Sequence, residues 1–437
     1  MEKIKKGNNK LADTVTIGFA LFAMFFGAGN LIFPPYLGRE LGDHWFLGFL
    51  CYIGVDIGLG LIAMMVIAVA GRGSDSITEK LGVKLSAIFL GVICICIGPA
   101  IAIPRVASIT YEVGLVPNFG NLNPILCTGV FFVFCWLICI SKSEVMDIVG
   151  KILSPLMVIA LLYMIVKGII TPIGDITMES SVDQAVSLGV SAGYQTMDMM
   201  AAVIFSISVI FTIKDKNYTA KKDQFTMLVA GGLIATALLF VVYGGLAYIG
   251  ATYAHNGEAM AQADVLVKVV LVLLGKSGLL LLGLIVILAC LTTAIGLITS
   301  ISEFFEEKLH ISYKILVTVF TIVSFLISNL GTDIIINMAA PILGIVYPVL
   351  ITLTFCSIAG DKLPVLGYRG GAAFAFIIAI IQQIEAFAGK DIISHALPMN
   401  SMGFGWIVPA IIGVVLGAIV AKVRGKDIEI ARACEIE

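Results

Sequence analysis

The feature that most constrains this chain is a series of about twelve stretches, each with roughly 20 predominantly apolar residues. A stretch of that length crosses the hydrocarbon core of a bilayer as one α-helix. Only 13% of the residues are charged, against roughly 25% in soluble globular proteins, so most of the surface has to face lipid. The expected fold class is therefore an all-α integral membrane protein. The predicted spans cover residues 13–37, 44–70, 85–111, 124–140, 152–171, 187–213, 224–252, 277–304, 315–330, 334–357, 370–388 and 402–421.

The positions of the Lys and Arg residues indicate one orientation in the membrane. Of the 27 basic residues, 21 fall on one side when the N-terminus is placed in the cytoplasm. An even number of spans then puts both termini in the cytoplasm, and residues 258–275 become an extracellular re-entrant or surface helix. The segments predicted to be cytoplasmic are 1–12, 71–84, 141–151, 214–223, 305–314, 358–369 and 422–437.

Composition and motifs exclude several classes of protein. The formal net charge is −2 and no large basic patch exists, so no nucleic-acid partner is expected. No G-x-x-x-x-G-K-[ST] motif is present, which argues against direct coupling to ATP. The nine cysteines and four histidines show no zinc-ligand spacing. We expect a single transmembrane domain over residues 1–437, in contact with a lipid bilayer and with no obligatory protein partner.

The first predicted span contains an unusual turn, Gly27-Ala28-Gly29-Asn30, followed by Pro34 and Pro35. Two glycines at this spacing weaken a helix, and Asn30 brings an amide to membrane depth. A helix interrupted there would present backbone amides to an anion and carbonyls to a cation. The same residues would also suit close packing between helices, with Asn30 as an interhelical hydrogen-bonding group. The motif alone does not decide between these interpretations.

The sixth span contains a second interruption, from Gly193 through Thr196 and Met197 to Asp198. An ionised carboxylate near the middle of a span is costly, so Asp198 should face a cavity, pair with a cation or carry a proton. The alternative is an aspartate at a helix end whose boundary is misplaced. Because Gly, Gln and Thr share the same turn, the functional interpretation is favoured.

Two further clusters of polar residues lie within spans. Thr292 and Thr293 offer oxygens suited to a small cation, although such threonines more often donate to the preceding turn of their own helix. Arg105 follows Pro104 in the third span, and it either forms an extracellular gate with an acid such as Glu112 or belongs to a structural ion pair.

Several ordered motifs resemble the branched-chain amino acid transporter family, the BrnQ-type sodium-coupled carriers, over nearly the whole chain. They are FxxFxGAGNLIFPP from Phe22, GPxxAxPRxxxxxYEVG from Gly98, GYxTMD from Gly193, ACLTTAxGL from Ala289, SEFF from Ser302, SNLG from Ser328 and PxLxxxYP from Pro341. That family is similar to the leucine–sodium symporter fold group. The resemblance implies a core of two inverted five-helix repeats, 13–171 and 187–357, with broken first and sixth helices. Two extra helices would follow at 370–421.

The resemblance also implies ligands for sodium and for the substrate. One sodium would lie between the first and eighth helices, bound by the carbonyls of Ala23, Phe26 and Ala289 and the hydroxyls of Thr292 and Thr293. Asn30 and Thr196 match ligands of a possible second sodium. The amides of Ala28 and Gly29 would bind the substrate carboxylate, near Asn30. The rest of the implied substrate site, its apolar walls included, comprises Phe25, Gly193, Met197, Asp198, Ala201, Phe205 and Leu297.

The function implied is import of leucine, isoleucine and valine by symport with sodium across the bacterial cytoplasmic (inner) membrane. Asp198 departs from the pattern of the fold group, where an uncharged hydroxyl residue stands. It could instead bind the substrate ammonium group or a proton, so a proton-coupled carrier or exchanger remains an alternative. A membrane-embedded enzyme is disfavoured, because no nucleophile or acid–base pair clusters with a histidine. A non-transporting sensor would need a signalling domain, which the predicted single membrane domain does not include.

Overall fold

The computed structural model of the chain describes residues 10–71, 73–120, 122–141, 154–253, 259–390 and 393–424. Every regular element within these ranges is helical, which confirms the expected all-α class. Most of the basic segments expected at 1–12, 141–151 and 422–437 lies outside the described residues.

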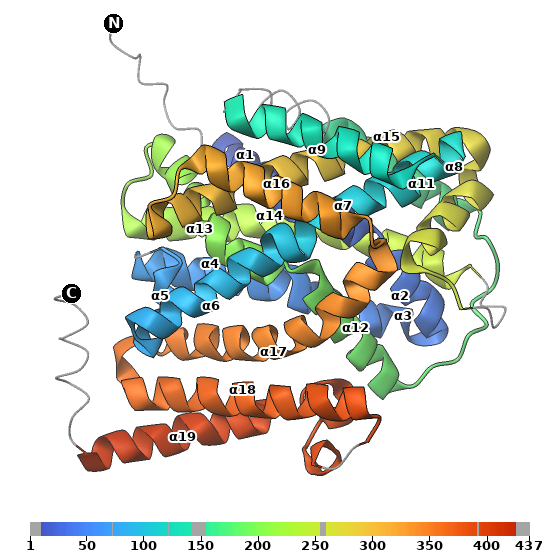
Figure 1. The fold of residues 1–437 in the computed structure, drawn as a ribbon. Coiled ribbons are helices and arrows are strands. Elements are labelled where there is room, and N and C mark those ends of the chain that lie inside the picture. The colour runs from blue at the N-terminus through green and yellow to red at the C-terminus, as the bar shows by residue number, and fades with distance from the viewer. Residues whose placement is uncertain are drawn as a thin grey trace, which may run out of the picture.

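The long helices run roughly side by side in one bundle (Figure 1). Short 3-10 turns connect several of them, and three π-helical turns interrupt the second and third spans. In chain order the main elements are α1 (Lys10–Phe25), η1 (Ala28–Leu31), α2 (Phe33–Leu41), α3 (Trp45–Ile53), η3 (Gly54–Gly58), α4 (Leu59–Ala70), α5 (Asp75–Thr78), α6 (Val83–Ile95), η5 (Cys96–Ala100), α7 (Ala102–Ile109), η6 (Thr110–Leu115), α8 (Val116–Phe119), α9 (Pro124–Ser141), α11 (Ser154–Ile170), α12 (Val182–Thr196), α13 (Asp198–Asp215), α14 (Lys221–Ala251), α15 (Gln262–Leu309), α16 (Tyr313–Ser328), α17 (Thr332–Ile358), α18 (Val365–Ala388) and α19 (Ile407–Arg424).

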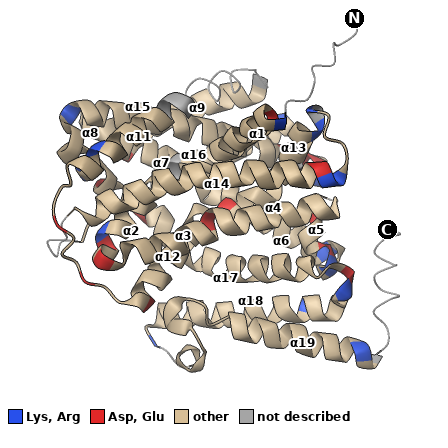
Figure 2. Cartoon of the chain, turned by 180° about the vertical axis from the view of Figure 1, so that it is seen from behind, with Lys and Arg blue, Asp and Glu red and all other residues tan. Residues whose placement is uncertain are grey.

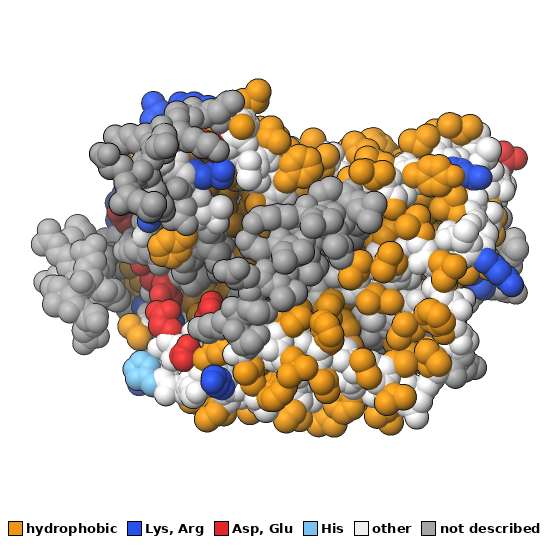
Figure 3. Space-filling view, turned by 90° about the horizontal axis from the view of Figure 1, so that it is seen from above, with side chains coloured by type: hydrophobic (Ala, Val, Ile, Leu, Met, Phe, Trp, Pro, Cys, Tyr) orange, Lys and Arg blue, Asp and Glu red, His pale blue; other side chains and the backbone are white. Residues whose placement is uncertain are grey.

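The helices have the length and composition of membrane spans. Within the described ranges, six helical stretches are long and apolar enough to cross a bilayer: Phe33–Ala70, Val83–Phe119, Lys221–Ala251, Gln262–Leu309, Thr332–Ile358 and Val365–Ala388. Four shorter apolar helices accompany them. Charged residues gather near the helix ends in Figure 2, and hydrophobic side chains cover much of the described part of the face in Figure 3. This distribution places the apolar side chains where lipid tails would lie.

Two helices stop and restart in the interior of the bundle. The first break separates α1 from α2 at η1, and the second separates α12 from α13 at Met197. Close backbone packing holds α12 in place, because a Cβ atom on Gly189 would lie only 2.3 Å from the carbonyl oxygen of Gly48 on α3. Any larger residue at position 189 would push the two helices apart.

The segment predicted as a separate extracellular helix is joined to the following span. Residues 262–309 form one long element, α15, that bends at Gly275, where φ is 64° and ψ is −158°. Only glycine adopts this backbone conformation readily. The bend sets the first part of α15 at an angle to the part that carries Thr292 and Thr293.

The last two helices form a pair at one edge of the bundle (Figure 1). A Cβ atom on Gly370 of α18 would lie 2.3 Å from the carbonyl oxygen of Gly413 on α19. The two backbones therefore touch directly, and α18 also contacts α17. This pair lies away from both helix breaks.

Candidate functional site

The first break leaves the carbonyl of Phe25 without its helical partner, and other groups replace that partner. Its oxygen accepts hydrogen bonds from the backbone nitrogen of Gly27 (3.0 Å), from Asn30 Nδ2 (3.2 Å) and from the Tyr243 hydroxyl (3.4 Å). A broken helix is tolerated in a membrane protein where the freed groups are satisfied by protein. Ala28 and Gly29, whose amides are predicted to bind the substrate carboxylate, lie in η1, but their surroundings fall outside the described set.

The second break is made by Met197, which has a left-handed backbone conformation with φ of 63°. A non-glycine residue in this region costs of order 1–3 kcal/mol, so the surrounding structure must impose it. The Thr196 hydroxyl donates to the Gly193 carbonyl oxygen (2.7 Å), and the backbone nitrogen of Asp198 donates to Thr196 Oγ1 (3.4 Å). These local bonds satisfy part of the interrupted helix.

Charges stand at both sides of the second break. Arg105 Nη1, from α7, donates to the carbonyl oxygen of Gln195 (2.5 Å) near the C-terminal end of α12. Asp198 is the first residue of α13. A helix C-terminus favours a cation and a helix N-terminus favours an anion, so both charges lie at the complementary helix end.

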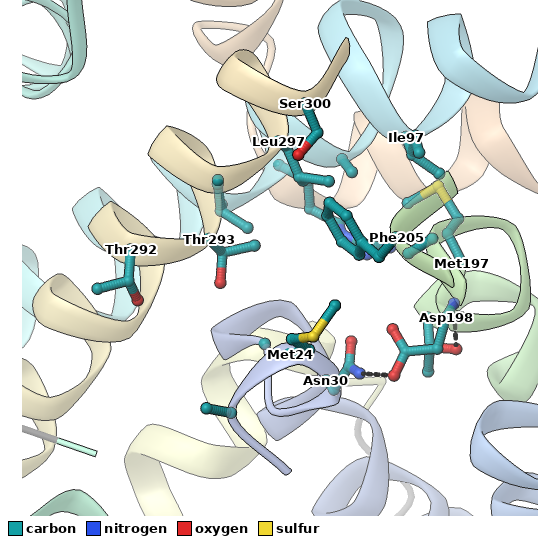
Figure 4. Close-up of a pocket in the computed structure, with 18 residues that line it drawn as sticks. Met24, Asn30, Ile97, Met197, Asp198, Phe205, Thr292, Thr293, Leu297 and Ser300 are labelled. Carbon is teal, nitrogen blue, oxygen red and sulfur yellow. Dashed lines mark hydrogen bonds between the residues drawn. The ribbon is translucent and has the colours of Figure 1, made fainter. Parts of the chain in front are cut away.

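A direct hydrogen bond joins the two breaks. Asn30 Nδ2 donates to Asp198 Oδ2 at 2.9 Å, and both side chains are buried. Figure 4 shows these two side chains pointing toward one another at the edge of a cavity. Asp56, in the π-turn of the second span, is fully buried beside Asp198, Thr196 and Tyr52. The sequence analysis gave no role to Asp56.

The cavity beside the breaks has a volume of about 340 Å³. Small-molecule sites commonly measure roughly 300–1,000 Å³ and combine apolar walls with a few polar groups. Figure 4 shows Met24, Phe205 and Leu297 around the space that Asn30, Asp198 and Thr293 also face. The lining residues are Ala23, Met24, Gly27, Asn30, Ile97, Ala102, Arg105, Val106, Thr196, Met197, Asp198, Ala201, Phe205, Thr292, Thr293, Gly296, Leu297 and Ser300.

Four residues of the predicted substrate and sodium sites are not among the residues that line this cavity. Phe25 packs against α4, where it would contact a Cβ atom on Gly60 at 3.2 Å. Phe26 stacks between two other aromatic rings, 5.1 Å and 6.1 Å away. Gly193 faces the second span, and a Cβ atom there would lie 2.7 Å from Val55 Cβ. Ala289 is buried, and its carbonyl oxygen accepts the Thr292 hydroxyl.

The two threonines of α15 lie opposite the first break. Thr292 Oγ1 donates to the carbonyl oxygens of Ala289 (2.9 Å) and Leu288 (3.2 Å), which is the common behaviour of threonine in a helix. A hydroxyl that donates in this way keeps lone pairs free for a cation. Thr293 Oγ1 lies 4.0 Å from the position of a Cβ atom on Gly27. Hard neutral oxygens from α15 therefore face the turn of the first helix, and this donor set suits sodium.

Arg105 and Glu112 do not pair in this structure. A Glu112 oxygen accepts from the backbone nitrogen of Thr332 (3.0 Å) at the start of α17, whereas Arg105 reaches Gln195. Arg105 lies on α7 and Glu112 lies on the following π-turn, η6, and their side chains reach different partners. A direct Arg105–Glu112 ion pair, one of the alternatives left open by the sequence, is therefore absent from the described contacts.

The sequence reasoning missed several residues that line the cavity. Helical periodicity would have found some of them, because Gly296 and Ser300 follow Thr293 at intervals of three and four residues. The same spacing relates Ala102 to Arg105 and Val106. Met24 lines the cavity in place of Phe25, a difference of one residue along a helix.

Comparisons with known proteins show the family of the chain. Residues 10–424 match the model of a family described as branched-chain amino acid transport protein. The chain is 34% identical to the branched-chain amino acid permease BrnQ of Bacillus subtilis over 430 residues, covering 94% of this chain and 97% of the relative. It is 36% identical to a putative branched-chain amino acid carrier protein of Staphylococcus saprophyticus, covering 95% and 98%.

Solved structures share the fold at low sequence identity. One is a sodium-coupled sialic acid symporter in a substrate-bound outward-open state, with a TM-score of 0.61, 14% identity and coverage of 94% of this chain and 89% of that chain. Another is the Eremococcus coleocola manganese transporter, with a TM-score of 0.59, 14% identity and coverage of 97% of both chains. At this identity the likeness concerns the fold alone.

Proposed function

Because this chain belongs to the branched-chain amino acid transport protein family, we propose that it imports leucine, isoleucine and valine by symport with sodium. It is a transport protein and not an enzyme, since its relatives are named as permeases and carriers. The observation that carries the proposal is the cavity where the two helix breaks meet, joined by the Asn30–Asp198 hydrogen bond.

The proposed scaffold has twelve spans in the bacterial cytoplasmic (inner) membrane, with both termini in the cytoplasm. The pair α1 and α2 forms the first span, and the pair α12 and α13 forms the sixth. Two inverted five-helix repeats, 13–171 and 187–357, build the core, and α18 and α19 are additional. In an inverted repeat the first and sixth helices occupy equivalent places, so their breaks meet at the midplane.

The amino acid binds in the cavity with its polar groups toward the breaks. Asp198 accepts the ammonium group, because Asn30 occupies Oδ2 and the carboxylate still faces the cavity. The aliphatic side chain lies against Met24, Phe205 and Leu297. One methylene in such a pocket contributes only ~1–3 kcal/mol, so leucine, isoleucine and valine are discriminated weakly.

Sodium is the co-transported cation and binds between α1 and α15. Ala23, Thr292 and Thr293 line the same cavity, and their oxygens are of the hard, neutral kind that sodium prefers. These helices belong to different repeats, so an ion that bridges them favours one of the two conformations. Coupling then follows from the differential affinity of the ion for the two states. A second sodium beside Asn30 and Thr196 competes with the ammonium group for Asp198.

The cavity extends from the breaks along α13 and α15 toward Ser300, on the side where α1 begins. Toward the other side, Arg105 contacts Gln195, and Gln195 Nε2 donates to the Ile336 carbonyl oxygen of α17 (3.3 Å). With the proposed topology this arrangement corresponds to an inward-facing state whose outer side is closed. Alternating access would break these contacts and close the space around Ser300.

The test is uptake of radiolabelled leucine into proteoliposomes under three conditions: a sodium gradient, a proton gradient, and no gradient of either ion. We expect accumulation only with inward sodium, and its loss in Asp198→Asn. Asp183→Asn is the matched control, since Asp183 lies in the first turn of α12 outside the cavity. Accumulation that a proton gradient drives in the absence of sodium would contradict sodium symport and support the proton-coupled carrier. The absence of uptake under every gradient would refute leucine transport.

A further inference from the structure

Two opposite charges line the same cavity without pairing. Arg105 and Asp198 are 2% and 7% exposed, and both border the 340 Å³ space. Arg105 is held by the Gln195 carbonyl, and Asp198 is held by the Asn30 amide and lies beside Asp56. No ion pair joins them within the described part of the chain. Buried charges that stay apart retain their capacity to bind a ligand of opposite charge.

The guanidinium of Arg105 uses few of its donors inside the protein. An arginine carries five N–H donors. Here Nη1 donates to Gln195, Nε is buried without an acceptor among the described residues, and the ring of Phe33 lies 5.5 Å from Cζ. Cζ lies over this ring, which accepts no strong hydrogen bond. None of the described contacts uses Nη2, so its N–H donors remain for an anion.

The protein keeps this cation in place before any ligand binds. Gln195 is the second-last residue of α12, so Arg105 sits at the negative end of a helix. The Gln195 side chain is itself anchored on α17 through Ile336. An arginine that is already oriented loses little conformational freedom on binding a carboxylate.

We infer that Arg105 binds the α-carboxylate of the transported amino acid while Asp198 binds its ammonium group. This inference rests on the proposed function. An α-amino acid carries both charges on one carbon, and the cavity supplies their two complements. With both charges held, the side chain is directed to the apolar walls. Arg105 is then a substrate-binding residue that excludes amines and carboxylic acids lacking the second charge.

A guanidinium suits this task better than backbone amides alone. It contributes a full positive charge and parallel N–H donors that match the two oxygens of a carboxylate. The turn at Gly27 can still contribute amides, but these are dipoles without net charge. In this role the charge of Arg105 binds the substrate carboxylate, which it could not do if it were paired with Glu112 in an extracellular gate.

The experiment measures equilibrium binding to the purified full-length protein in detergent with sodium present. The ligands are L-leucine, L-leucinol, which lacks the carboxylate, and 4-methylpentanoate, which lacks the ammonium group. The variants are Arg105→Gln, Arg105→Lys and Asp198→Asn. Arg369→Gln is the control, because Arg369 also donates to a backbone carbonyl, that of Lys80 (2.9 Å), but lies outside the cavity.

We expect Arg105→Gln to weaken leucine about 10- to 100-fold, the size of a charged hydrogen bond, and to leave leucinol within threefold of its wild-type affinity. Arg105→Lys should give a smaller loss, again for leucine only. Asp198→Asn should weaken leucine and leucinol but spare 4-methylpentanoate. Arg369→Gln should change none of the three affinities.

Two results would overturn the inference. Equal weakening of leucine and leucinol in both Arg105 variants would show that Arg105 only supports the break at α12. Unchanged leucine binding in Arg105→Gln would place the carboxylate elsewhere. A wild-type protein that binds no leucine would instead refute the proposed function, which this design reports separately. If Arg105→Gln does not fold, the test rests on Arg105→Lys: a loss of affinity for leucine but not for leucinol supports the inference, and equal losses contradict it.

Discussion

The side chains of Asn30 and Asp198, 168 positions apart in the chain, form a hydrogen bond of 2.9 Å across two interrupted helices. Each residue lies beside its own break, so the bond ties the first break to the second.

Removal of the amide at position 30 should weaken substrate binding without unfolding the protein. Asn30→Ala loses the bond to Asp198 and the bond to the Phe25 carbonyl. We expect leucine affinity to fall about tenfold, as one hydrogen bond to a charged group contributes ~1.5–3 kcal/mol. Isothermal titration calorimetry with leucine measures this change in affinity. Asn118→Ala, which removes an amide donating to the Leu279 carbonyl, is the control. Wild-type leucine affinity in Asn30→Ala would show that the turn serves helix packing and not substrate binding.

The hydroxyl of Thr292 should matter for sodium more than for protein level. Thr292→Ala should raise the half-saturating sodium concentration for leucine uptake at least tenfold, while Thr292→Ser should keep it near wild type. Thr236 is a matched control, because its hydroxyl also donates to a carbonyl four residues earlier, in α14 (2.8 Å). An unchanged sodium dependence in Thr292→Ala would show that the Thr292 hydroxyl of α15 does not bind sodium.

The left-handed backbone at Met197 predicts that asparagine will destabilise the protein less than valine at this position. Asparagine adopts positive φ more readily than β-branched residues, so Met197→Asn should unfold at a higher temperature than Met197→Val. The backbone difference is of order 1–3 kcal/mol. At Met200, a buried position with regular helical geometry, valine should be the better tolerated of the two. Thermal unfolding followed by fluorescence gives all four values. The same order at both positions would disprove a specific backbone requirement at the break.

The two neighbouring carboxylates should differ in their effect on the substrate. Asp198 lines the cavity, whereas Asp56 is fully buried behind it and borders Tyr52 and Thr196. We expect Asp198→Asn to lower leucine affinity by tenfold or more, and Asp56→Asn to lower it by less than threefold. Asp56→Leu should reduce the yield of folded protein, because it replaces the buried polar neighbour of the Tyr52 and Thr196 hydroxyls with an apolar side chain. Equal losses of affinity would mean that the pair binds the ammonium group jointly.

The class of the fold followed from the apolar stretches alone, because a span that long and that poor in charge has few alternatives to a membrane helix. The interruption at Gly27–Asn30 and the residues around Asp198 were also visible, since glycines and a carboxylate are costly inside an apolar helix. The bend at Gly275 was not anticipated as part of one helix. The sequence predicts a separate re-entrant or surface helix for this segment, because an amphipathic pattern does not show whether two helices are joined.

The residues that line the cavity were predicted less well, and the reason is geometric. Phe25 and Met24 are adjacent and both apolar, so a rotation of α1 by a fraction of a turn decides which of them faces the cavity. Arg105 has one acid near it in the sequence, Glu112, but its partner is a backbone carbonyl of another helix. A carbonyl is present at every position, so no sequence pattern could mark it.

The sequence by itself determined that this chain is a bundle of membrane helices with costly polar groups at a few depths, because each such group is visible against an apolar background. Only the tertiary structure decided that Asn30 meets Asp198, that Asp56 lies behind that pair, and that Arg105 faces the same cavity. These contacts join helices far apart in the chain. They depend on how each helix is rotated and shifted, which is set by packing summed over many side chains and not by any local pattern.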